Sequence, residues 1–168
     1  MRKLVIAGLL LAVVLIAAAC GGDDGSGNSG AMNEGHDNGM GAMGDVPGEV
    51  ADESDADRTI KVEALDELAF DPESLSVEAG EVVTFEITND GQVVHEFVLG
   101  DETFQESHEE DMTGGHGDEM GHMENGITLG PGESGSLTWR FTESGEILFG
   151  CHVRGHYEGG MVGSIVVG

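Results

Sequence analysis

Hydrophobic and polar residues alternate in several short stretches of this chain. The first stretch begins near Arg58, where Ile60, Val62 and Ala64 stand between polar neighbours. Alternation with a period of two is typical of a strand that buries one face. The same pattern predicts further strands over residues 82–88, 93–99, 127–129, 136–142, 146–151 and 161–167.

Turn-forming residues separate these predicted strands. Glycine-containing turns are expected at residues 78–81, 89–91 and 130–133, and Pro72 interrupts strand pairing earlier in the chain. Short strands at regular spacing, joined by glycine-rich turns, are typical of an all-β sandwich. Residues 58–168 therefore predict one all-β domain, and about 110 residues suffice for its hydrophobic core.

The first residues of the chain show a different pattern. Arg2 and Lys3 precede an unbroken apolar run that ends at Ala19. The run is short for a transmembrane helix, so residues 1–19 are predicted to be a signal peptide of an exported protein. Residues 17–20 resemble a bacterial lipobox, which predicts that Cys20 is lipidated and anchors the chain to the outer face of the cytoplasmic membrane. Because Ala17 replaces the commoner leucine, a secreted protein without a lipid is the alternative.

Residues 20–57 are rich in Gly, Asp, Ser, Asn and Glu, with scattered Met and His, and contain almost no branched apolar side chains. Such a segment buries too little apolar surface to offset the entropy of ordering. We expect a flexible tether between the membrane anchor and the folded domain.

The whole chain is strongly acidic, with 33 acidic residues against 6 basic ones and a formal net charge of −27. A surface of this charge disfavours binding to nucleic acid and to anionic lipid headgroups. It favours cations and basic protein partners.

The cysteine content points to a metal. If Cys20 is acylated, Cys151 is the only free thiol and no intramolecular disulfide can form. A single thiol outside the cytosol is exposed to oxidation unless it is occupied. His156 and Met161 follow it in one short segment, and His95 opens an apolar stretch upstream. Two imidazoles, a thiolate and a thioether are the ligands of a type 1 copper site.

Each of these residues also has a structural interpretation. Cys151 is compatible with an inert buried thiol, His95 with a hydrogen-bonded core histidine, and Met161 with the first core residue of the last strand. His156 is compatible with a loop histidine that binds no metal. His152, next to the thiol, is predicted to point away from the metal.

Several motifs resemble the cupredoxins, the family of plastocyanin and azurin. The resemblance lies in Phe70-x-Pro72, in Val77-x-Ala79-Gly80-Glu81-x-Val83-x-Phe85, in Asn89 and His95, and in Cys151-x4-His156-x4-Met161. It implies a Greek-key β-sandwich that holds one type 1 copper ion. It also implies that the ligands are His95, Cys151, His156 and Met161.

Two differences from the motifs of other copper proteins restrict the functions that we expect for this chain. Multicopper oxidases resemble this chain in the same loop, but they have a histidine where this chain has Gly150, and they need His-x-His pairs that its sequence lacks. We therefore expect a binding protein and not an enzyme. Plastocyanins and azurins often have an asparagine at the position of Glu96, where it ties the two ligand loops together. A carboxylate there would favour the more positive copper state if it points inward.

Residues 101–126 interrupt the strand pattern with an acidic insertion. Thioether and imidazole side chains within it are soft ligands that suit additional, weakly bound copper. They are His108, Met112, His116, Met120, His122 and Met123. The alternative is a solvated loop that binds nothing.

Two functions follow. The sequence favours a monomeric one-electron carrier that exchanges electrons with a redox partner protein. The alternative is copper sequestration or delivery, with the insertion as a second copper store and a copper-transport protein as the partner.

Overall fold

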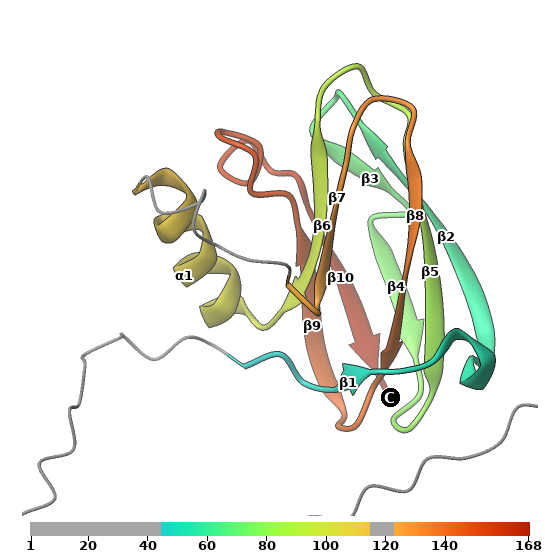
Figure 1. Ribbon diagram of the computed structural model, residues 1–168. Coiled ribbons are helices and arrows are strands. Elements are labelled where there is room, and N and C mark those ends of the chain that lie inside the picture. Colours follow the sequence, from blue (N-terminus) through green and yellow to red (C-terminus); the bar gives the residue numbers. More distant parts are fainter. Residues whose placement is uncertain (1–44, 115–122) are drawn as a thin grey trace, which may run out of the picture. The chain divides into compact units, whose positions relative to one another are not determined.

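The computed structural model describes residues 45–114 and 123–168, which form a sandwich of two five-stranded sheets (Figure 1). The all-β sandwich predicted from the alternating pattern is thus confirmed. The predicted signal peptide, Cys20 and most of the predicted tether lie outside the described residues. Within the described part of the chain, no helix is long and apolar enough to cross a membrane.

The two sheets combine neighbouring and distant segments of the chain. The first contains, in spatial order, β1 (Glu49–Val50), β8 (Ser134–Arg140), β5 (Val82–Asn89), β2 (Arg58–Leu65) and β3 (Ala69–Asp71). The second contains β4 (Ser74–Val77), β10 (Val162–Val167), β9 (Gly145–Gly150), β6 (His95–Gly100) and β7 (Gly126–Leu129). The pairs β2–β5 and β4–β10 are parallel, and the other pairs are antiparallel.

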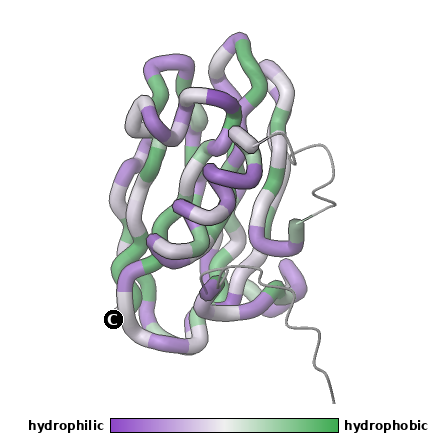
Figure 2. Tube along the Cα trace, turned by 90° about the vertical axis from the view of Figure 1, so that its left-hand side faces the viewer, coloured by the Kyte–Doolittle hydropathy of each residue, from purple (hydrophilic) through white to green (hydrophobic). Residues whose placement is uncertain are grey.

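Aromatic rings from both sheets fill the space between them. Phe85 of the first sheet and Phe97 of the second lie with their ring centroids 5.4 Å apart. Phe97 in turn stacks on Phe149 at 5.0 Å. Hydrophobic positions alternate with hydrophilic ones along the strands (Figure 2), as a sheet with one buried face requires.

Regular structure is present before the domain boundary predicted at residue 58. Strand β1 pairs with β8, and a short 3₁₀ helix, η1 (Glu53–Asp55), follows it. The indole nitrogen of Trp139 donates a hydrogen bond to the carbonyl of Pro47 at 3.2 Å. The residues of the predicted tether make these contacts with their backbone atoms, which composition alone does not reveal, so the last part of the predicted tether belongs to the sandwich.

The acidic insertion begins with a helix that the strand pattern does not indicate, α1 (Glu102–Thr113). Asp101 caps it by accepting a hydrogen bond from the backbone N–H of Phe104 at 2.7 Å. The helix packs against β6 and β9 (Figure 1) and buries Phe104, Gln105 and His108. The sequence does not indicate which side of the helix is buried, because two of the three buried residues are not hydrophobic.

His108 is an unusual residue to bury in this position. It is 1% exposed, and among the residues that the structure describes neither ring nitrogen has a hydrogen-bond partner. Burial, together with the nearby His152, lowers the pKa of His108 to about 4. The pKa of His152 is likewise lowered by burial to about 4.

We expect His108 to make the metal-free protein less stable in acid. In the unfolded chain this histidine takes up a proton near pH 6.5, whereas in the folded protein it does so only near pH 4. Protonation of His108 on unfolding therefore costs no stability above pH 6.5 and lowers the stability as the pH decreases towards 4, by at most roughly 3 kcal/mol. Denaturant unfolding of the metal-free His108→Phe variant across this pH range should give a shallower decline than the wild type.

Glu106→Gln is the matched control, because it removes a titratable group from the exposed side of the same helix. An unchanged pH dependence in His108→Phe would show that His108 does not become protonated on unfolding as inferred.

Candidate metal centre

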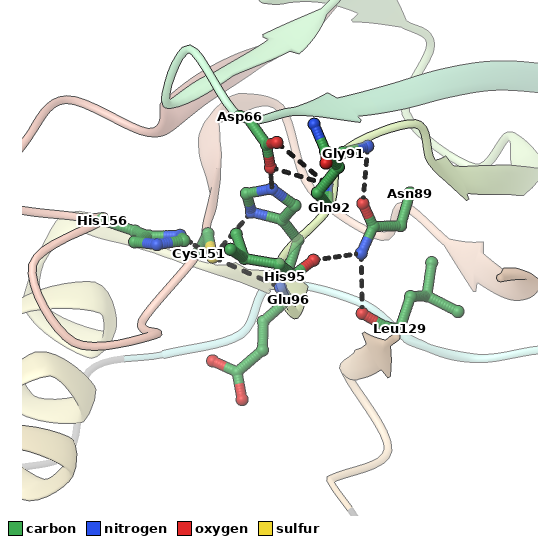
Figure 3. A network of polar contacts seen from close by, with 10 residues as sticks. Asp66, Asn89, Gly91, Gln92, His95, Glu96, Leu129, Cys151 and His156 are labelled. Carbon is green, nitrogen blue, oxygen red and sulfur yellow. Dashed lines mark hydrogen bonds and ion pairs between the residues drawn. The ribbon is translucent and has the colours of Figure 1, made fainter. Parts of the chain in front are cut away.

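Three metal-binding side chains converge at one end of the second sheet. The ligand atoms of His95, Cys151 and His156 all lie within 4.8 Å of one another. Figure 3 shows both imidazole rings directed at the sulfur of Cys151. Three of the four copper ligands predicted from the sequence are thus brought together by the fold.

Strand pairing positions two of these residues. His95 is the first residue of β6, and Cys151 directly follows β9. The two strands are antiparallel neighbours, with Val98 opposite Gly150. Neighbouring strands lie about 5 Å apart, so residues from β6 and the end of β9 come within metal-ligand distance.

The loop between β9 and β10 supplies the remaining residues, and backbone hydrogen bonds close it. The N–H of His156 donates to the carbonyl of Val153 at 2.8 Å, and the N–H of Met161 donates to the carbonyl of His156 at 2.9 Å. The N–H of Cys151 donates to the carbonyl of Met161 at 3.1 Å. Both ends of the loop thus meet beside the thiol. Met161 is fully buried there, and its role as the axial ligand stays a prediction.

The distances fit a single ion. Cys151 Sγ lies 3.8 Å from His95 Nδ1 and 3.4 Å from His156 Nδ1. Two atoms that bind one ion at about 2.0–2.3 Å, at roughly 120° to each other, are separated by about 3.7 Å. A thiolate with two imidazoles, held together at one end of the sandwich, is a donor set that suits copper.

The thiol and one imidazole have shifted pKa values in the metal-free protein. Burial raises the pKa of Cys151 to about 11, so the thiol holds its proton at neutral pH and releases it when a metal binds. Burial, and the nearby His95, lower the pKa of His156. His156 is therefore neutral at pH 7, as metal binding requires.

A second layer of polar groups surrounds His95 (Figure 3). Asn89 is fully buried, and its amide donates to the carbonyls of Val93 at 2.7 Å and Leu129 at 2.9 Å. Asp66 accepts hydrogen bonds from the backbone N–H of Gln92, which lower its pKa, and lies beside His95 Nε2. Asp66 was not identified from the sequence, because it lies in a turn 29 residues before His95 and belongs to no motif.

Glu96 joins the two segments that carry the ligands. Its backbone N–H points at Cys151 Sγ across 3.3 Å, and its side chain accepts a hydrogen bond from the N–H of His152 at 3.2 Å. Figure 3 shows the carboxylate pointing away from the side chains of His95 and Cys151. Burial raises the pKa of Glu96. The residue thus makes the connection between ligand loops that the cupredoxin resemblance assigns to an asparagine.

His152 points away from the metal centre, towards α1. Its ring nitrogens lie 2.8 Å from Glu109 Oε2 and 2.7 Å from Gln105 Oε1. The ring of Tyr157 stacks on it at 4.6 Å. No pattern in the sequence indicates these partners on α1.

The predicted secondary copper ligands fall into two groups. His108 is buried beside His152, with the ring centroids 4.5 Å apart, while Met112 and Met123 are half-buried. His116, Met120 and His122 lie outside the described residues. In the described part of the chain, the group formed by His95, Cys151 and His156 is the one whose ligand atoms meet. A second copper site therefore stays a prediction.

Known proteins with similar sequences bind copper. The chain is 36% identical over 151 residues to the copper-resistant cuproprotein CopI of Rubrivivax gelatinosus, covering 89% of this chain and 86% of that protein. It is 34% identical over 154 residues to the protein of the same name from Pseudomonas aeruginosa, covering 75% and 84% of the two chains.

Solved structures agree with these relatives. Auracyanin B superposes with a TM-score of 0.61 at 29% identity, over 73% of this chain and 96% of that chain. Auracyanin A, a "blue" copper protein from Chloroflexus aurantiacus, gives a TM-score of 0.56 at 27% identity, over 66% and 98%. Residues 56–168 match the model of the copper-binding proteins of the plastocyanin/azurin family. The chain therefore belongs to this family, the cupredoxins, and copper is its metal.

Proposed function

We propose that this protein handles copper in resistance to the metal, by sequestering or delivering it. One observation carries the proposal. Relatives that match most of this chain are copper-resistant cuproproteins, and this chain has a converged His-Cys-His site for the same metal.

Copper handling is thus preferred over electron transfer, whereas the sequence alone favoured electron transfer. The complete ligand set and the absence of enzyme motifs favoured an electron carrier, but both features are shared by copper-handling proteins. The relatives, as copper-resistant cuproproteins, support copper handling, which was the alternative. The soft Met and His side chains of residues 101–126 support it too, because they suit copper beyond the first equivalent.

The residues of the site differ in burial and in the donor atom that they would offer to copper. Cys151 and His95, both buried, supply a thiolate and an imidazole that water cannot reach easily. His156 is half-buried and supplies the second imidazole at the more accessible edge. Copper bound there can alternate between Cu(I) and Cu(II), which have different ligand preferences.

An electron carrier is the second candidate. It is supported by the half-buried edge of His156 and by the likeness to auracyanin A, a "blue" copper protein. In this case the partner is a redox protein, whereas copper handling requires a copper-transport protein. In either case we propose an exported, monomeric, non-enzymatic protein that Cys20 anchors to the outer face of the cytoplasmic membrane.

Replacing Cys151 with Ser should abolish the intense thiolate-to-copper absorption, because a hydroxyl cannot provide the sulfur-to-copper charge transfer. The measurement is the visible spectrum of the full chain with one equivalent of copper. Cys20→Ser, which changes the other cysteine of the chain, should leave the band unchanged. Persistence of the band in Cys151→Ser would show that the site has been assigned wrongly.

A second variant separates the two functions. It replaces Met112, Met120 and Met123 with Leu and His116 and His122 with Gln, and it keeps the buried residues of α1 so that the helix still packs. If the insertion stores copper, the wild type binds more than one equivalent in a titration and the variant binds one. Both proteins should keep the coloured site, and cells with the variant should tolerate less copper.

One equivalent in both proteins, with equal copper tolerance of the cells, would contradict copper handling by the insertion. Fast and reversible electron exchange at the remaining site would then favour the carrier.

A further inference from the structure

The turn between β2 and β3 reaches the metal centre although no motif marks it. It is closed by a hydrogen bond from the N–H of Leu68 to the carbonyl of Leu65 at 3.1 Å. Leu68 has a φ of 59°, in the left-handed region that a bulky non-glycine residue rarely adopts. Unusual backbone conformations of this kind are found preferentially at functional sites. Asp66 lies in the same turn, shortly before Leu68 in the sequence.

The side chain of Asp66 links this turn to the segment that leads into His95. Its two oxygens accept hydrogen bonds from the backbone N–H of Gln92 at 3.0 and 2.9 Å. Oδ1 also lies 3.3 Å from Nε2 of His95 (Figure 3). The carboxylate is thus held by the backbone in a position where it faces the imidazole.

The contact determines which nitrogen of His95 carries the proton. A carboxylate only accepts hydrogen bonds, so Nε2 carries the hydrogen when the two groups are bonded. The other nitrogen, Nδ1, faces Cys151 Sγ at 3.8 Å. In this tautomer the lone pair of Nδ1 is directed at the place of the metal, which is the role that outer carboxylates play towards metal-binding histidines.

The neighbouring glycine makes room for the carboxylate. A Cβ atom added at Gly91 would overlap Oδ1 of Asp66 and would lie 3.0 Å from Nε2 of His95. Gly91 is not among the glycines with a positive φ, so space, and not backbone conformation, explains its presence. Glycine at this position is therefore a second, independent sign that Asp66 and His95 must approach each other.

We propose that Asp66 is a positioning residue of the copper site: it fixes His95 with Nδ1 free to bind, and its charge favours Cu(II) over Cu(I). The inference rests on copper binding at His95, Cys151 and His156, but not on whether the copper is stored or carries electrons. The side chain is 36% exposed, so solvent weakens its charge at longer range. The effect must therefore pass through the direct contact with His95.

Substitutions at Asp66 separate the hydrogen bond from the charge. Asp66→Asn keeps an oxygen that can accept from Nε2 but removes the charge, whereas Asp66→Ala removes both. We expect the relative affinity for Cu(I) over Cu(II) to rise about tenfold in Asp66→Asn, which is an increase of about 59 mV in the reduction potential. Asp66→Ala should show at least this increase and should also lose copper faster to a chelator.

Nuclear magnetic resonance of the metal-free protein tests the positioning role without copper. With ¹⁵N-labelled histidine, His95 should be in the Nε2–H form in the wild type and in Asp66→Asn. In Asp66→Ala it should populate both tautomers. Gly91→Ala keeps the carboxylate but displaces it, so its tautomer mixture should resemble that of Asp66→Ala.

The control is Glu67→Gln, which removes one negative charge from the same exposed turn but from a residue for which the described structure shows no side-chain hydrogen bond. The reduction potential of its copper site and the tautomer of its His95 should equal those of the wild type. The inference would be overturned if the wild type and both Asp66 variants had the same reduction potential and His95 had the same tautomer in all three proteins. A wild type without the coloured copper site would overturn the site itself and the inference with it, so the two failures can be told apart.

Discussion

The antiparallel pairing of β6 with β9 is the constraint on which the metal centre depends. It places His95 and Cys151 at the same end of one sheet, with Val98 opposite Gly150. Glu96 strengthens this arrangement because its N–H points at the thiol and its carboxylate accepts from the N–H of His152. His95 and Cys151 are therefore brought together by the pairing of the strands that carry them. A preorganised site of this kind loses less entropy on binding.

The inserted helix is part of the same arrangement. Gln105 and Glu109 of α1 contact the ring nitrogens of His152, the residue next to the cysteine ligand. The first part of the insertion thus has a structural role that its acidic composition conceals. Residues 101–126 consequently combine a segment that packs against the sandwich with methionines and histidines that suit copper.

The centre has a buried side and an accessible side. Cys151 and His95 are buried, while His156 is half-buried. Copper exchange and electron transfer would both use the His156 edge, so the geometry of this site is compatible with either function. The distinction comes from what surrounds the site, namely the insertion, and from the likeness to copper-resistant cuproproteins.

Residue pattern and motif spacing were sufficient to predict the sandwich, the position of most strands and the group of His95, Cys151 and His156. A half-buried strand leaves a period of two in the sequence, and a cysteine with histidines at this spacing is a characteristic copper-binding set. The polar residues that support these ligands became visible only in the folded chain. Asp66, Gln105 and Glu109 act through contacts between segments far apart in the sequence. Such contacts depend on strand register and helix placement, which leave no local pattern along the chain.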